Sequence, residues 1–254
     1  MKTFILELKE RNEPLFYFAL VCTAASIVFL ILTKFSTVQV LGVNAWFKPF
    51  KFALSIALYA GTMAWLVSYL PRFNTSLFAW SVIVLLEFEI IYIALQAARG
   101  EQSHFNVSSL VYVALYALMA LAATAVSIYT AYVAVLFFKT NFPSLPMYYV
   151  WGIRMAIVLF VIFSLEGFVM GSRLSHSIGT TDGGAGLPVV NWSTQGGDAR
   201  IAHFIGMHAL QVIPLASYYL LKDVKATLAL SVVYTALAVF TLVQALNGKP
   251  FHKF

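Results

Sequence analysis

The chain contains very few charged residues and almost no cysteine. Only 10% of its 254 residues are Asp, Glu, Lys or Arg, whereas 61% are hydrophobic. This composition excludes an ordinary soluble globular domain. Because Cys22 is the single cysteine, a disulfide within the chain and a metal site built from thiolates are excluded as well. Any metal site must therefore use histidine, carboxylate or carbonyl ligands.

The beginning of the sequence has no pattern typical of a cleaved secretory signal. Residues 1–13 mix basic side chains with glutamates, and the first apolar run already has full spanning length. We expect the first helix to remain as an anchor. The net charge of +6 is distributed over every loop, which is typical of the Lys and Arg that flank membrane spans. The charge therefore predicts no nucleic-acid partner.

Long apolar runs are what the sequence has in abundance. A membrane-spanning helix needs about 20 mostly apolar residues, and the runs are continuous rather than alternating, which favours helices over a barrel. The sequence predicts an all-α polytopic integral membrane protein, with seven transmembrane helices in one bundle forming a single domain. The predicted spans are Pro14–Phe35, Pro49–Leu70, Leu77–Ala98, Leu110–Phe138, Met147–Gly171, Arg200–Leu220 and Ala226–Leu246.

The connections between these spans are unequal. Those on the side of the N-terminus are minimal, whereas the opposite side carries the long segment Ser172–Ala199. This segment combines glycines with Trp192 and other apolar residues, which favours an ordered cap over a flexible tether. The distribution of Lys and Arg tips slightly toward an N-terminus inside if Lys48 and Lys51 belong to a buried site. We expect a bacterial inner membrane protein with a cytoplasmic N-terminus and a C-terminus outside.

Five acidic or histidine side chains fall inside predicted spans, whereas the basic residue Arg154, near the start of the fifth span, can snorkel to the interface. A charge near the bilayer centre costs at least about 2.5 kcal/mol on insertion scales, so each needs a partner, a cavity or a function. These residues are Glu87, Glu89, Glu166, His203 and His208.

Helical geometry arranges the polar residues of the sixth span on one face. His203, His208 and Gln211 fall within an arc of about 140°. The two histidines are separated by about 7.5 Å along the axis, so each needs partners from another helix. Pro214, just beyond Gln211, predicts a kink that widens a cavity there.

A second polar face follows the third span. Glu89, Tyr92 and Gln96 have i, i+3, i+7 spacing, whereas Glu87 points elsewhere. Because Asp198 precedes the sixth span, we expect its carboxylate to cap the first turn of that helix.

These faces predict one site in the outer half of the bundle. Neutral imidazole and carboxylate are suitable ligands for first-row transition metals, and bundle interiors often hold such sites. The predicted catalytic residues are His208, His203, Glu89, Glu166 and Gln211. The predicted metal ligands are His203, His208, Glu89 and Glu166. Further cofactor contacts are predicted for His104, His176, Arg200 and Asn191.

The motifs of known membrane families are absent at the positions that matter. Rhodopsins resemble the chain in helix number, but the last predicted span has no lysine for retinal. Two-haem cytochromes need paired histidines on facing helices, and only the sixth span carries any. Metalloproteases need two histidines at i, i+4 with an adjacent Glu, which "HFIGMH" does not supply.

Three functional hypotheses are compatible with this pattern. The first is a membrane redox or metal-dependent enzyme that holds a transition metal or haem iron and acts on a lipid-borne or small polar substrate. The second is a proton-coupled transporter in which the same acids and histidines form a proton relay. The third is a receptor or assembly factor whose glycine-rich loop binds a partner.

Overall fold

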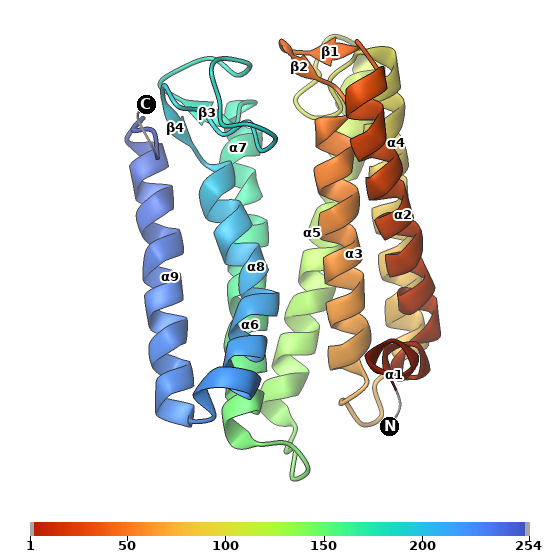
Figure 1. Ribbon diagram of the computed structural model, residues 1–254, viewed down its shortest axis with the longest axis vertical. Coiled ribbons are helices and arrows are strands. Elements are labelled where there is room, and N and C mark those ends of the chain that lie inside the picture. Colours follow the sequence, from red (N-terminus) through yellow and green to blue (C-terminus); the bar gives the residue numbers. More distant parts are fainter. Residues whose placement is uncertain (1–2, 252–254) are drawn as a thin grey trace. The chain divides into compact units, whose positions relative to one another are not determined.

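The computed structural model describes residues 3–251. These residues contain seven helices that are long and apolar enough to cross a membrane, and short strands occur only in the loops (Figure 1). The helices are α1 (Phe4–Arg11), α2 (Glu13–Phe35), α3 (Phe47–Val67), α4 (Thr75–Arg99), α5 (Leu110–Lys139), α6 (Met147–Leu165), α7 (Gly167–Arg173), α8 (Arg200–Ala216), the π-helix η1 (Ser217–Leu221) and α9 (Val224–Leu246). The strands are β1 (Gln39–Val40), β2 (Val43–Asn44), β3 (Ser177–Ile178) and β4 (Gly197–Asp198).

The predicted spans agree with the seven spanning helices to within three residues at each end, when α6 and α7 are taken as one span and α8 and η1 as another. Local capping explains several of the boundaries. The side chains of Asn12, Asn74 and Asp223 each accept a hydrogen bond from a backbone N–H in the first turn of α2, α4 and α9, respectively. At the other end of α4, Gly100 takes the left-handed conformation that stops a helix. The short helix α1 is additional to the predicted elements.

The chain divides into two compact units, unit 1 (Met1–Val126) and unit 2 (Ser127–Phe254). In unit 1, α2 packs on α3, and α4 packs on both. In unit 2, α6, α8 and α9 pack against one another around small and aromatic side chains such as Ala156, Phe163 and Ala209. The single-domain organisation expected from the sequence stays a prediction.

Close approach between α6 and α8 depends on two glycines. A side chain at Gly206 of α8 would overlap the ring of Phe163. A side chain at Gly152 of α6 would lie 2.6 Å from the Ser217 hydroxyl and 3.4 Å from the backbone of Pro214. The helix therefore packs tightly beside Pro214, whereas we expected the kink to widen a cavity.

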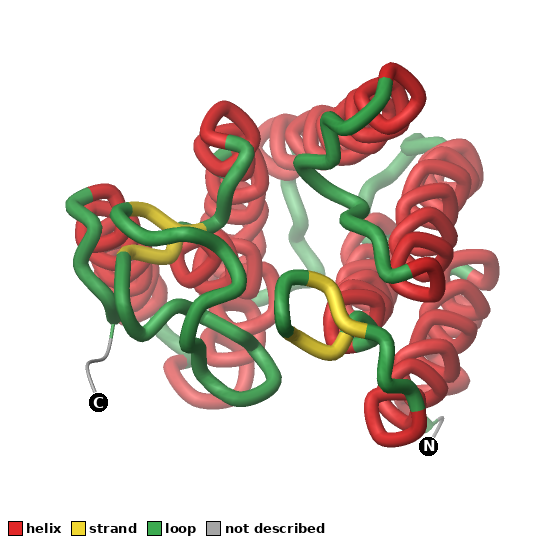
Figure 2. Tube along the Cα trace, turned by 90° about the horizontal axis from the view of Figure 1, so that it is seen from above, coloured by secondary structure: helices red, strands yellow, loops and turns green. Residues whose placement is uncertain are grey.

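Residues 174–199 form a structured loop over the ends of the helices of unit 2 (Figure 2). β3 and β4 pair antiparallel, with Ser177 opposite Asp198. The ring of Trp192 packs edge-on against Phe204 of α8, with 5.5 Å between the centroids. These are the contacts expected of an ordered cap.

Candidate functional site

Glu166 lies where the fifth span is interrupted. α6 ends at Leu165 and α7 begins at Gly167, so Glu166 is the junction between them. Its side chain is 4% exposed, and neither carboxyl oxygen has a hydrogen-bond partner among residues 3–251. A buried carboxyl without hydrogen bonds is costly, especially inside a membrane span. This cost makes Glu166 the strongest single indication of a functional site.

His203, in the first turn of α8, is the ionisable partner of Glu166. Its Nδ1 atom lies 3.4 Å from Oε2 of the carboxyl, which is an ion-pair distance without hydrogen-bond alignment. The imidazole is 31% exposed, in contrast to the buried carboxyl. The pair therefore joins an accessible base to a buried acid.

Gly167 lies beside this pair, and the sequence alone did not connect it with His203. A side chain at this position would lie 3.5 Å from Cε1 of the imidazole. This is an ordinary van der Waals distance, so the backbone at the start of α7 lies near the ring without requiring glycine. The available signal was a glycine directly after a glutamate inside a span.

His208 and Gln211 lie farther along α8 and form a separate pair. Nδ1 of His208 is 3.2 Å from Oε1 of Gln211, and the Phe204 ring packs edge-on against the imidazole at 4.3 Å. Both neighbours belong to the same helix as His208. The predicted polar face of α8 is thus present, but Glu166 forms its ion pair with His203.

Glu89 belongs to unit 1, in the middle of α4. Its residue is 6% exposed, and Tyr92 and Gln96 on the same face are buried as well. The Oε1 atom of Glu89 and the hydroxyl of Tyr92 have no hydrogen-bond partner among the described residues. The predicted polar face is therefore an inward face of unit 1. That Glu89 shares a site with Glu166 and the two histidines stays a prediction.

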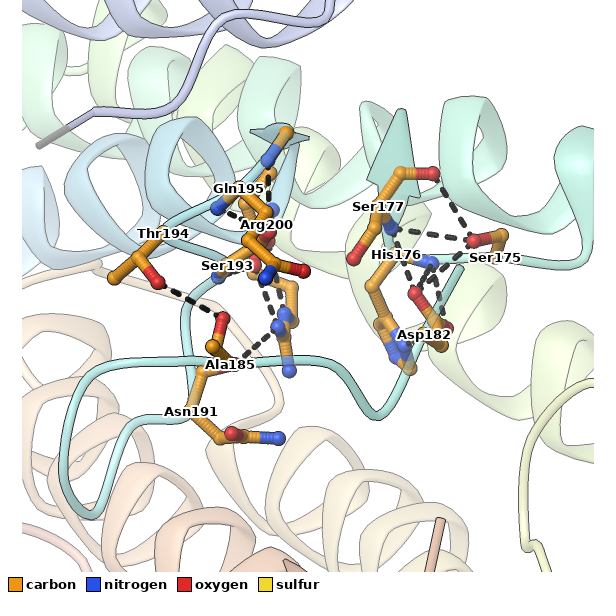
Figure 3. A network of polar contacts seen from close by, with 12 residues as sticks. Ser175, His176, Ser177, Asp182, Ala185, Asn191, Ser193, Thr194, Gln195 and Arg200 are labelled. Atoms are coloured by element: carbon orange, nitrogen blue, oxygen red, sulfur yellow. Dashed lines mark hydrogen bonds and ion pairs between the residues drawn. The ribbon is translucent and has the colours of Figure 1, made fainter. Parts of the chain in front are cut away.

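The loop of unit 2 is organised around two carboxylates, of which Asp182 is the first (Figure 3). Asp182 accepts hydrogen bonds from Nδ1 of His176 at 2.8 Å, from the backbone N–H groups of His176 and Ser177, and from the Ser175 hydroxyl. Burial disfavours the charged form of Asp182, but these hydrogen bonds outweigh it and hold the pKa of the carboxyl well below its usual range. The pair of His176 with Asp182 stabilises the loop; the predicted cofactor contact of His176 stays a prediction.

Asp198 is the second carboxylate, and it is 1% exposed. It accepts hydrogen bonds from Nε and Nη2 of Arg200 at 2.9 and 2.5 Å and from the backbone N–H of Ser193. Arg200 also donates to the backbone carbonyl of Asn191 at 2.5 Å. The N-cap residue of α8 is Ala199 rather than Asp198, but Asp198 still accepts the backbone N–H of Arg200. Arg200 and Asn191 therefore have roles in holding the loop, and their cofactor contacts stay predictions.

His104 lies in the loop between α4 and α5 of unit 1. Its Nδ1 atom is 3.1 Å from the Ser103 hydroxyl, and its ring packs near the rings of Phe52, Phe105 and Tyr116. This aromatic setting is that of a packed loop residue. A cofactor contact at His104 stays a prediction.

Within residues 3–251, no three side chains of His, Cys, Asp or Glu gather closely enough to hold a metal ion. The structure joins two of the predicted ligands, Glu166 and His203. A comparison with known protein families, curated proteins and solved structures found no match to this chain. The fold defines an all-α polytopic integral membrane protein with seven spans, and the function has to be inferred from its side chains.

Proposed function

We propose that the protein is a proton-coupled membrane transporter for a small polar solute, and that Glu166 and His203 bind the coupled proton. The observation that carries this proposal is the pairing of a carboxyl that is 4% exposed with an imidazole that is 31% exposed, 3.4 Å apart, within membrane spans. Ionisable groups inside spans are typical of proton pathways in pumps and transporters.

The exposures suggest the direction of proton transfer. His203 receives a proton from the exposed side, and it passes the proton to the buried carboxyl of Glu166. Proton transfer to the carboxyl leaves both groups neutral, so the electrostatic attraction between them is lost. Because Glu166 lies between α6 and α7, this loss acts inside the fifth span.

The metal-dependent or haem enzyme is the second candidate, because imidazole and carboxylate are also metal ligands. It requires further donors beside Glu166 and His203. The receptor hypothesis depends on the loop alone and requires neither residue. A stoichiometric metal or a haem absorption band in the purified protein, lost in the variant His203→Ala, would favour the enzyme.

The transporter is tested in proteoliposomes that contain a pH-sensitive dye. Pools of small polar solutes are added under an inward proton gradient, and a substrate is recognised by solute-dependent acidification of the interior. We expect Glu166→Gln to abolish this acidification, because the amide cannot take up a proton. The matched control is Glu87→Gln, which changes an exposed glutamate of α4 and should leave the acidification intact.

Equal loss in both variants would contradict the proposal, since it would indicate a general effect of removing a charge from a span. Full activity of Glu166→Gln would contradict it directly. Circular dichroism and size-exclusion profiles of each variant establish that the protein tested is folded.

A further inference from the structure

Unit 1 contains a pocket of about 540 Å³ between the second half of α4 and the first turns of α5. One part of its lining is apolar and includes Ile91, Leu95 and Leu115. The other part is polar and includes Tyr92, Arg99 and Tyr112. The pocket is independent of the Glu166–His203 pair, which belongs to unit 2.

The polarity of the pocket changes along the axis of α4. Ile91 and Leu95 are 51% and 57% exposed, and Arg99 follows in the last turn of the helix. From residue 91 to residue 99 the helix rises about 12 Å. The apolar part therefore lies inside the span, and the cationic part lies at its end, where lipid headgroups are found.

Tyr92 shows that the pocket has a polar group without a partner. The residue is 7% exposed, and its hydroxyl has no hydrogen-bond partner among the described residues. A buried hydroxyl costs free energy unless it is hydrogen-bonded. A ligand oxygen in the pocket would provide the missing acceptor once the side chains that cover the hydroxyl have moved, because the oxygen itself is enclosed.

Arg99 is the cationic side chain of the pocket lining. Arg99 forms no ion pair with a carboxylate among residues 3–251. The neighbouring Glu101 is not part of the lining, and its Oε2 atom accepts a hydrogen bond from the Asn106 amide at 3.4 Å. Ser109 and Tyr112 add two hydroxyl groups to the lining, both of them donors suited to a phosphate.

We propose that this pocket binds one anionic membrane phospholipid. Arg99, with the hydroxyls of Ser109 and Tyr112, recognises the headgroup phosphate. An acyl chain occupies the apolar part beside Ile91, Leu95 and Leu115, and the Tyr92 hydroxyl donates to an ester oxygen. The match of an anionic head and an apolar tail to a cationic mouth and an apolar interior supports this occupant.

The proposal is tested by native mass spectrometry of the full chain in a neutral detergent. Phosphatidylglycerol and phosphatidylcholine with identical acyl chains are titrated separately, and a third titration uses inorganic phosphate alone. We expect a one-to-one complex with phosphatidylglycerol that survives detergent removal, weaker binding of phosphatidylcholine, and no complex with phosphate. Equal binding of both lipids, or binding of phosphate alone, would overturn the proposal.

Two arginine variants separate this site from general surface charge. Arg99→Gln should weaken phosphatidylglycerol binding at least about tenfold, the effect of losing one charge-assisted hydrogen bond. Arg173→Gln is the matched control, because Arg173 is also an exposed arginine in the last turn of a helix. Equal losses in both variants would mean that any exposed arginine suffices, and the pocket proposal would be wrong.

A tyrosine variant gives a second readout. Tyr92→Phe removes an unpartnered hydroxyl, so it should not lower the melting temperature of the lipid-free protein, and it should reduce lipid affinity about fivefold. Unchanged lipid affinity in Tyr92→Phe would show that the hydroxyl does not contact the lipid.

Discussion

The two units of this protein each bury a carboxyl inside a membrane span, but they surround it differently. In unit 1, Glu89 is 6% exposed, and its Oε1 atom has no hydrogen-bond partner among the described residues. In unit 2, Glu166 is similarly buried but lies 3.4 Å from an imidazole. The loops differ too: Asp182 and Asp198 of unit 2 each accept several hydrogen bonds, whereas Glu101 of unit 1 accepts one at 3.4 Å.

Under the proposed function, this difference separates a carboxyl that can only hold a proton from one that can transfer it. An isolated buried carboxyl is accommodated most easily in its neutral form. A carboxyl beside an imidazole has a neighbouring group with which it can exchange a proton. Burial alone is therefore a weaker indication of proton chemistry than burial beside a second titratable group.

The largest expected difference between the units concerns helix packing. Gly206→Ala places a methyl group into the Phe163 ring, and overpacking of this kind costs about 1–3 kcal/mol or more. Gly61→Ala, in α3 of unit 1, meets no atom within 4 Å, so it should be neutral or stabilise the helix by up to about 1 kcal/mol. Melting temperatures in detergent measure both. Equal stability of the two variants would show that α6 and α8 are not held at the distance described.

The next difference concerns the loops. Asp182→Asn removes a charge that accepts hydrogen bonds from His176 and Ser177, and each charge-assisted hydrogen bond contributes about 1.5–3 kcal/mol. Glu101→Gln should cost less than about 0.5 kcal/mol, as expected for an exposed residue with one long hydrogen bond. Thermal unfolding in detergent compares the two variants with the parent chain.

The same carboxyl predicts a dependence on pH. Because the folded-state pKa of Asp182 is lowered, its stabilisation is fully present above the unfolded value of about 3.9 and is lost as the pH falls below it. The parent chain should therefore lose stability between about pH 5 and pH 3, and Asp182→Asn should lose less over that range. Parallel pH profiles for the two proteins would contradict the role given to Asp182.

A smaller effect is expected for the aromatic contact that holds the loop on α8. Trp192→Ala removes the packing on Phe204, and an aromatic pair contributes about 0.5–1.5 kcal/mol beyond its buried area. Limited proteolysis between Gly179 and Gly197 should be slow in the parent chain and about tenfold faster in this variant. Val189→Ala, at a loop residue that is 46% exposed, is the control. Rapid cleavage of the parent chain would mean that the loop is only a tether.

Much of this architecture is predictable because a long apolar run crosses a membrane as a helix, in which the backbone N–H and C=O groups are hydrogen-bonded to one another. Intramembrane ionisable residues are conspicuous for the same reason, so Glu166 and His203 could be selected individually from the sequence. The sequence places them in one predicted site, but which histidine lies beside Glu166 could not be predicted, because it depends on the rotation of α8 relative to α6. The helix α1 was missed although Phe4 and Leu8 have the i, i+4 spacing of an apolar stripe, and the pair of Glu7 with Arg11 at i, i+4 is a further helical signal.

The rotation of α8 also bears on the comparison of His203 with His208. From the sequence alone, depth along the helix favours His208 as the more important residue, since an unpartnered imidazole is most costly near the bilayer centre. The structure gives His208 a partner on its own helix, Gln211 at 3.2 Å. His203 instead faces a carboxyl that has no hydrogen bond. The proposed function therefore assigns the proton to His203, and the greater importance of His208 stays a prediction.

The smallest predicted change concerns His208. His208→Ala removes one hydrogen bond to Gln211 within α8. Even hydrogen bonds between spanning helices contribute only about 0.6 kcal/mol on average, so the melting temperature should fall slightly and proton-linked activity should persist. His203→Ala should leave stability similar but abolish the activity, because the buried carboxyl then has no group from which to receive a proton. The measurement is dye-detected acidification in proteoliposomes beside thermal unfolding of each variant. Loss of activity in His208→Ala alone would move the proton-binding group from the Glu166–His203 pair to the interior of α8.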